Sequence, residues 1–292
     1  MRIPDAIAQK RPFVSLEFFP PKKREDWPAF LQTARELAGL KPLFVSVTYG
    51  AGGSSRSNTL EICRLLAERC GFTVMPHLTG VLASPESIDR FLDEIKAIGI
   101  DNVLALRGDR PAAFTGADEE LFAAFPHAAD LIRHIREHSP GLAVGTAAFP
   151  EGHAEARSFS SDLKVMRDKF QSGADFGITQ LFFDNRSYFD YVERLGELGV
   201  TAPVIPGILP VRSLASLRFT LKLCNARVPG SLINELLDAE EREGPKAAFE
   251  VGIAHARAQV RELFERGAPS APETSLLRDE IAKVAAVLCY PA

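Results

Sequence analysis

A length of 292 residues suits one or two domains or a single α/β barrel, and the 46% hydrophobic and 25% charged residues exclude disordered and fibrous proteins. The 34 basic and 38 acidic side chains give a net charge of −4, so we expect neither a nucleic-acid-binding surface nor attraction to an anionic membrane. No apolar run reaches the roughly 18 residues of a membrane span and no apolar export signal stands at the start, which predicts a cytoplasmic protein.

Seven short runs rich in β-branched and aromatic residues are predicted to be β-strands. Several of them are almost continuously apolar, as is typical of parallel strands that are covered on both faces. In chain order they are 13–19, 43–49, 72–79, 102–108, 142–149, 176–183 and 203–209.

Amphipathic segments between these runs are predicted to be α-helices. Ser84 is a favourable N-cap, and Pro85 follows it at the first helical position. Residues 231–265 form two further amphipathic stretches that divide near Gly244 and Pro245, and we assign them to packing. The other predicted helices are 25–39, 56–70, 84–98, 127–138, 160–172 and 187–198.

This alternation of strands and helices, with short loops, predicts an α/β fold of the TIM type, a (β/α)8 barrel that forms one domain over residues 1–292. No G-x-G-x-x-G motif follows the first strand, which argues against a Rossmann fold. The eighth strand is expected to be irregular or degenerate, because residues 266–280 contain two prolines and few β-forming residues.

Two histidines stand four residues apart on a predicted helix, a spacing that could hold a metal ion. They are His134 and His138, and no acidic or cysteine ligand is placed with them in the sequence. We therefore interpret them as part of a solvated helix face and predict no metal site. The four cysteines form no C-x-x-C pair, which predicts reduced and mostly buried thiols.

Polar residues follow the ends of several predicted strands, where TIM-barrel active sites lie. Glu17 stands among apolar residues of the first strand, which predicts a raised pKa and a carboxylic acid able to donate a proton. The structural alternative is a pair with Arg107 or a lysine. Asp109 could likewise form an ion pair with Arg107 at the rim, and His77 could contact a ligand or make a structural hydrogen bond.

Eight motifs occur in order over roughly residues 13–230. They are SLEFFPPK (15–22), VSVTYGAGG (45–53), PHLTG (76–80), ALRGD (105–109), FPEGHAEA (149–156), GITQLFFD (177–184), PGILPV (206–211) and NARVP (225–229). Together they resemble the methylenetetrahydrofolate reductase family. The resemblance implies a (β/α)8 barrel that reduces 5,10-methylenetetrahydrofolate to 5-methyltetrahydrofolate with hydride from NADH or NADPH, normally carried by bound FAD.

The resemblance also implies roles for individual residues. Glu17 matches the proton donor that opens the folate ring to an iminium, Asp109 an aspartate that contacts the pterin and helps to set flavin electronics, and Gln180 a glutamine that contacts folate and nicotinamide. The aromatic residue that usually stacks on the nicotinamide aligns with Thr220, but Phe219 is adjacent and is the candidate. The flavin-contacting positions correspond to Thr48, Tyr49, Ala51, His77, Arg107, Gly108, Phe149, His153, Asp162 and Lys169.

Departures from the family pattern cluster at the expected flavin site. Phe149 stands where a tyrosine is usual, Val165 where an asparagine is usual and Asp168 where an arginine is usual. The charge reversal beside a diphosphate is expected to cost on the order of a few kcal/mol if it is desolvated. The chain could therefore pass hydride from nicotinamide directly to the folate without tightly bound FAD. The alternative is a conventional FAD-dependent reductase whose diphosphate is held by Arg167 or Lys164.

Other functions stay compatible with the sequence. A related enzyme could oxidise methyltetrahydrofolate in a demethylation pathway, because a reversible hydride step uses the same residues. A non-catalytic folate-binding subunit would not need Glu17, which is present. The family's last-strand signature H-F-Y-T-L-N-R is missing, and Arg278 is at most a remnant of it.

Overall fold

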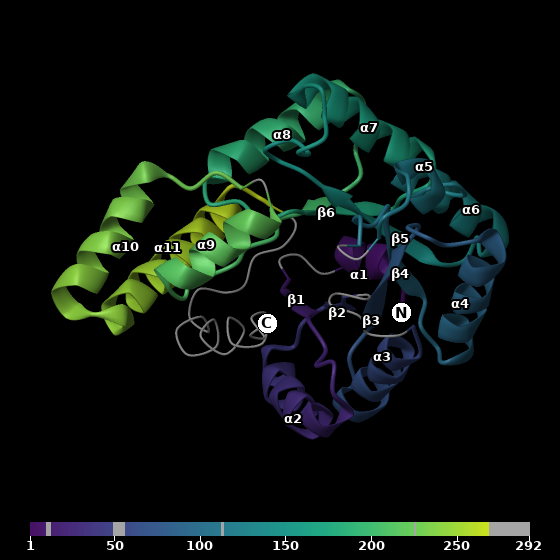
Figure 1. The fold of residues 1–292 in the computed structure, drawn as a ribbon, viewed down its shortest axis with the longest axis horizontal. Coiled ribbons are helices and arrows are strands. Elements are labelled where there is room, and N and C mark those ends of the chain that lie inside the picture. The colour runs from purple at the N-terminus through teal and green to yellow at the C-terminus, as the bar shows by residue number, and fades with distance from the viewer. Residues whose placement is uncertain (10–12, 49–55, 112–113, 225, 269–292) are drawn as a thin grey trace. The chain divides into compact units, whose positions relative to one another are not determined.

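The structure is a computed structural model that describes residues 1–9, 13–48, 56–111, 114–224 and 226–268. Seven strands follow one another in a single sheet in sequence order (Figure 1). Each pair from the first strand to the fifth is parallel. The strands are β1 (Ser15–Phe18), β2 (Phe44–Val47), β3 (Val74–Thr79), β4 (Asn102–Leu106), β5 (Ala143–Ala148), β6 (Phe176–Thr179) and β7 (Val204–Ile205).

Helices occupy the segments between consecutive strands, α1 precedes β1, and α9 to α11 follow β7. Three helices have no counterpart in the sequence prediction: α1, α5 and α9. The helices are α1 (Ile3–Gln9), η1 (Arg24–Asp26), α2 (Trp27–Leu37), η2 (Ala38–Leu40), α3 (Arg56–Cys70), α4 (Pro85–Ala97), α5 (Asp118–Leu121), α6 (Ala128–His138), α7 (Phe159–Gln171), α8 (Asn185–Glu197), α9 (Leu214–Leu223), α10 (Gly230–Glu243) and α11 (Pro245–Glu265).

This architecture confirms the predicted α/β fold of the TIM type, because parallel strands in sequence order alternate with helices. All seven strands lie inside their predicted ranges. The segment expected to supply the eighth strand, with Arg278, falls largely outside the described residues. Within the described part of the chain, every helix falls short of the length and apolar content that crossing a membrane demands.

The described residues group into two compact units. The first contains residues 1–10, 15–147 and 168–177, and the second contains the rest of the described chain. That residues 1–292 behave as one domain stays a prediction.

The core of the first unit consists of the strands and the inner faces of their helices. All four residues of β2 are buried, three of them apolar and the fourth the polar Ser46. Helix α4 buries Ile88, Leu92 and Ile95 from one face, and the Ser84 hydroxyl caps its start by accepting the backbone N–H of Ser87 at 3.3 Å. Gly145 on β5 has no room for a side chain, since a Cβ there would lie 2.8 Å from the Phe176 ring.

The second unit is built on α8 to α11. Helices α10 and α11 pack along each other (Figure 1), and the chain turns between them at Gly244, whose φ is +83°. Helix α11 meets the segment after β7 at Gly252, where a Cβ would lie 1.8 Å from the carbonyl oxygen of Val211. Glycine at this position therefore allows direct contact between a helix and a loop backbone. The predicted division of residues 231–265 at Gly244 and Pro245 is confirmed.

Candidate active site

Glu17 is placed beside two polar residues by the register of the first three strands. Glu17 on β1 pairs with Ser46 on β2, and Ser46 pairs with Met75 on β3. Residues in register on parallel strands face the same side of the sheet, as do residues two apart on one strand. The side chains of Glu17, Ser46 and His77 therefore share one face.

Both polar neighbours of Glu17, Ser46 and His77, lie close to the same carboxylate oxygen. The Ser46 hydroxyl donates to Glu17 Oε2 at 3.1 Å, and His77 Nε2 lies 3.4 Å from the same oxygen, an ion-pair distance when the imidazole is protonated. Ser46 and His77 are buried, whereas 37% of the Glu17 side chain is exposed. Ser46 and His77 thus contact the Glu17 carboxylate from the buried side, and the rest of the carboxylate stays exposed to solvent.

The pKa of Glu17 departs from the sequence prediction. Burial raises this pKa, but the facing imidazole of His77 and the hydroxyl of Ser46 favour the ionised form and lower it by more, so the pKa lies below its ordinary value. The predicted rise is therefore wrong for the protein without ligand. The apolar neighbours of Glu17 along the chain gave no sign of the polar neighbours on the adjacent strands.

The loop after β4 presents the predicted residues around Asp109. Gly108 has a φ of +89°, and a Cβ there would lie 2.7 Å from the Val81 side chain, so the turn requires glycine. Asp109 follows this turn and is exposed. The Arg107 guanidinium lies 4.7 Å from the centre of the Phe122 ring, in a cation–π contact.

Two more of the predicted cofactor contacts in the first unit make backbone contacts. Thr48 is buried at the end of β2, and its backbone N–H donates to the carbonyl of Phe18 at 3.0 Å. Lys169 is also buried, and its Nζ donates to the carbonyl of Ala147 at 2.8 Å. Tyr49 and Ala51 lie outside the described residues.

The second unit contains the predicted residues around His153. The rings of Phe149 and His153 meet edge to face with their centres 4.7 Å apart. The backbone N–H of His153 donates to a carboxylate oxygen of the buried Asp162 at 3.3 Å. At the end of β6, the side-chain oxygen of Gln180 accepts the backbone N–H of Leu181 at 2.9 Å.

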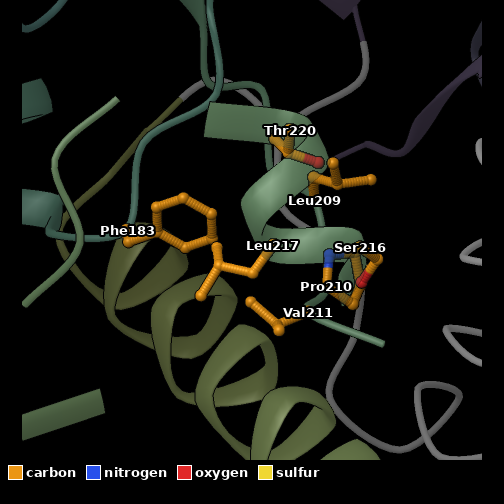
Figure 2. Close-up of a pocket in the computed structure, with 7 residues that line it drawn as sticks. All are labelled: Phe183, Leu209, Pro210, Val211, Ser216, Leu217 and Thr220. Atoms are coloured by element: carbon orange, nitrogen blue, oxygen red, sulfur yellow. The ribbon is translucent and has the colours of Figure 1, made fainter. Parts of the chain in front are cut away.

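Helix α9 carries the two residues considered for nicotinamide stacking. Phe219 is 54% exposed, whereas Thr220 faces a small hollow between α9 and the segment after β7 (Figure 2). The sequence prediction had no helix here, although Ser213 and Ser216 form a reciprocal capping box at its start. The hollow is lined by Phe183, Leu209, Pro210, Val211, Ser216, Leu217 and Thr220.

Comparison with known proteins assigns the family. The family model for methylenetetrahydrofolate reductase matches residues 2–282. The 5,10-methylenetetrahydrofolate reductase of Pectobacterium carotovorum is 35% identical over 262 residues, which cover 90% of this chain and 85% of that protein. The chain belongs to the methylenetetrahydrofolate reductase family.

Two longer members of the methylenetetrahydrofolate reductase family are named for different nicotinamide cofactors. A probable NADPH enzyme of Caenorhabditis elegans is 32% identical over 282 residues, which cover 92% of this chain and 41% of that protein. A probable NADH enzyme of Oryza sativa is 32% identical over 264 residues, which cover 86% of this chain and 44% of that protein. The chain thus spans less than half the length of these two relatives.

A solved structure supports the fold of this methylenetetrahydrofolate reductase family member. It is an uncharacterized protein from Clostridium thermocellum, described as binding two copies of 5-methyl-5,6,7,8-tetrahydrofolic acid. It matches with a TM-score of 0.67 and 15% identity over 97% of both chains.

Helix α7 contains several of the residues expected to contact FAD, the cofactor that the resemblance to the methylenetetrahydrofolate reductase family implies. Asp162 and Lys169 keep the family residue types, and both are buried and bonded to backbone groups. Val165 is 46% exposed, and Asp168 is also exposed. A diphosphate needs hydrogen-bond donors or cations, whereas these two positions present an apolar side chain and a carboxylate. At Val165 and Asp168, α7 does not fit a diphosphate.

The histidine pair on α6 has acidic neighbours that the sequence did not reveal. His134 Nε2 lies 2.7 Å from Asp89 on α4, and His138 lies 3.3 Å from Asp89 and 3.1 Å from Asp93. These side chains form ion pairs between two helices at a face that is still partly exposed to solvent. In the described ranges, no group of three or more histidine, cysteine or acidic side chains is arranged to hold a metal ion.

Proposed function

We propose that this chain reduces 5,10-methylenetetrahydrofolate to 5-methyltetrahydrofolate with hydride from NADH or NADPH, and that Glu17 is the general acid. The observation that carries the proposal is the partly exposed Glu17 carboxylate, held at Oε2 by Ser46 and faced by His77. Membership of the family supports the reaction. Asp109, exposed after its glycine turn, and Gln180 are the proposed folate contacts.

Glu17 activates the substrate by protonating a nitrogen of its five-membered ring. The carbon–nitrogen bond then opens, and the resulting iminium carbon accepts hydride to become the methyl group. Because the pKa of Glu17 is lowered in the protein without ligand, the acid form must be favoured when the substrate binds. A substrate that covers the exposed part of Glu17 removes water from the carboxylate, and that change raises its pKa.

We further propose that the hydride passes directly from nicotinamide to the iminium, without tightly bound FAD. The support is the exposed side of α7, where Val165 and Asp168 replace the asparagine and arginine that the family pattern leads us to expect. The competing possibility is a flavoenzyme in which Lys164, exposed on the same helix, or Arg167 contacts the diphosphate. Phe219 is the proposed stacking partner of the nicotinamide.

A visible absorption spectrum of the purified protein separates these routes. The spectrum is recorded before and after incubation with excess FAD and gel filtration, and reduction of methylenetetrahydrofolate is assayed in parallel with NADH and with NADPH. We expect no retained flavin band and turnover with at least one nicotinamide. A retained band with flavin-dependent turnover would overturn the direct route, whereas absence of turnover under every condition would overturn the reductase proposal itself.

A cytoplasmic location and a single domain over residues 1–292 stay predictions. So do the cofactor contacts assigned by resemblance to Thr48, Arg107, Gly108 and His153.

A further inference from the structure

We propose that His77 supplies the proton that Glu17 passes to the folate, an inference that rests on the proposed function of Glu17. His77 lies on β3, is buried, and directs Nε2 to within 3.4 Å of Glu17 Oε2. Among the described residues, this ring nitrogen makes no hydrogen bond. The Glu17 carboxylate, at an ion-pair distance, is therefore the group with which this nitrogen can exchange a proton.

The surroundings leave His77 and Glu17 to exchange a proton with each other. On the far side of His77, β4 presents the apolar Leu104 in register, and the residue two positions before His77 on the same face of β3 is Met75. Among the described residues, the polar groups that act on Glu17 are His77 and the hydroxyl of Ser46, which does not titrate in the working range of an enzyme. The pair can therefore hold one proton, on the imidazole or on the carboxylate.

The access of water to Glu17 determines whether the shared proton is bound by His77 or by Glu17. When His77 is protonated, water around the partly exposed Glu17 stabilises the carboxylate and the imidazolium as an ion pair. A substrate over Glu17 excludes that water, and a neutral imidazole beside a neutral carboxylic acid is then favoured, because separated charges cost more in a medium of low dielectric constant. Substrate binding itself would thus produce the acid.

The step balances as a relay of one proton. The Nε2–H bond of the His77 imidazolium breaks and an O–H bond forms at Glu17 Oε2, which leaves both groups neutral. Glu17 then transfers that proton to the ring nitrogen of the substrate, becomes a carboxylate, and leaves the opened folate as the cationic iminium. Hydride from the nicotinamide neutralises the iminium, and His77 takes up a new proton from water before the next turnover.

The test compares pH profiles of kcat for the wild-type chain, His77→Gln and Glu17→Gln. Glutamine at position 77 keeps a donor group but does not titrate, so Glu17 must take its proton from solvent. We expect His77→Gln to lose at least about tenfold in kcat at pH 7.5 and to recover toward the wild-type value as the pH falls to about 5.5. A parallel profile, with the same loss at every pH, would overturn the relay.

A second measurement does not depend on turnover. The ¹⁵N chemical shifts of the His77 ring, assigned by their disappearance in His77→Gln, are recorded with and without 5-methyltetrahydrofolate. We expect the ring to change from imidazolium to neutral imidazole when the folate binds, and an unchanged protonation state would contradict the inference. If Glu17→Gln keeps wild-type activity, the proposed function of Glu17 fails. If Glu17→Gln is inactive while His77→Gln has a wild-type profile, the relay alone fails.

Discussion

The Ser46 hydroxyl donates to Glu17 Oε2 at 3.1 Å from the position directly in register on the neighbouring strand. The donor is buried and the acceptor is partly exposed, so the strand pairing fixes one oxygen of a carboxylate that the substrate can still reach. The pKa of Glu17 therefore depends on the pairing of β1 with β2.

Replacement of Ser46 by alanine should raise the pKa of Glu17. The hydroxyl stabilises the ionised carboxylate, and its removal leaves the effect of burial opposed by His77 alone. The measurement is a ¹³C NMR titration of the Glu17 carboxyl in the wild-type chain and in Ser46→Ala. Ser216→Ala, which removes a capping hydroxyl on α9, is the control and should leave the Glu17 titration unchanged. An unchanged or lower pKa in Ser46→Ala would contradict the prediction.

The lowered pKa of Glu17 also predicts how stability depends on pH. Ionised Glu17 binds its proton less readily in the folded chain than in the unfolded chain. Its contribution to stability is therefore present above the ordinary pKa of 4.5 and lost as the pH falls through the lower folded value. Urea unfolding of the wild-type chain and Glu17→Gln should give a difference in unfolding free energy that is constant near neutral pH and becomes less favourable to the wild type below pH 4.5. A difference that stays constant to pH 3 speaks against the shift.

Two substitutions on α7 and one directly after β5 should allow the chain to bind a flavin. In the triple variant Phe149→Tyr, Val165→Asn and Asp168→Arg, the carboxylate becomes a bidentate cation and the apolar position becomes a hydrogen-bonding one. We expect FAD affinity to rise by at least about tenfold, which corresponds to roughly 1.4 kcal/mol. Equilibrium dialysis of FAD measures it. Asp168→Ala, which removes the negative charge without adding a donor, should give only part of the gain, and equal affinities in all three chains would refute the interpretation.

Phe219→Ala should weaken nicotinamide binding without changing stability. The side chain is 54% exposed, so its loss removes little core contact, whereas loss of a stacked ring costs about 1–3 kcal/mol of binding. Steady-state kinetics should show a KM for NADH or NADPH that rises by about tenfold with an unchanged thermal midpoint. Leu237→Ala on α10 is the matched control, since Leu237 is 44% exposed and has no proposed role. Equal effects of the two substitutions on KM would remove Phe219 from the site.

Gly252→Ala should destabilise the second unit. A Cβ at this position would lie 1.8 Å from the Val211 carbonyl oxygen, so α11 or the loop must move, at a cost of about 1–3 kcal/mol or more. Gly196→Ala is the matched control, because Gly196 lies within α8 and nothing stands within 4 Å of its Cβ position. That substitution should stabilise the chain by about 0.5–1 kcal/mol through helix propensity. Denaturant unfolding measures both, and an unaltered Gly252→Ala chain would show that the contact is absent.

The features that depend on local pattern were predictable from the sequence. Each strand lies within a segment rich in apolar residues, and the capping serine at position 84 and the break at Gly244 mark helix ends by their own chemistry. Helix α1 was not predicted from the sequence because its local pattern is short. Helix α1 has only seven residues, and a tertiary contact supports it, since the Asn102 side chain accepts the backbone N–H of Ile3 at 2.7 Å.

The errors at the candidate site arise from contacts between residues far apart in the sequence. The direction of the Glu17 pKa shift depends on Ser46 and His77, 29 and 60 positions away, and only the strand register brings them together. The acidic partners of His134 and His138 likewise come from another helix. A single sequence shows which residues can titrate but not which neighbours will share their proton.

Glu17, Ser46 and His77 come from three consecutive strands that pair only with their immediate neighbours in the chain. The proposed proton-donating group is therefore encoded in one uninterrupted stretch, approximately residues 13–80. Exchange of that stretch between two members of the family would carry the acid together with the groups that set its strength. The residues on α7 belong to a different part of the sequence, so substitutions at the proposed cofactor contacts can accumulate while Glu17, Ser46 and His77 are inherited together.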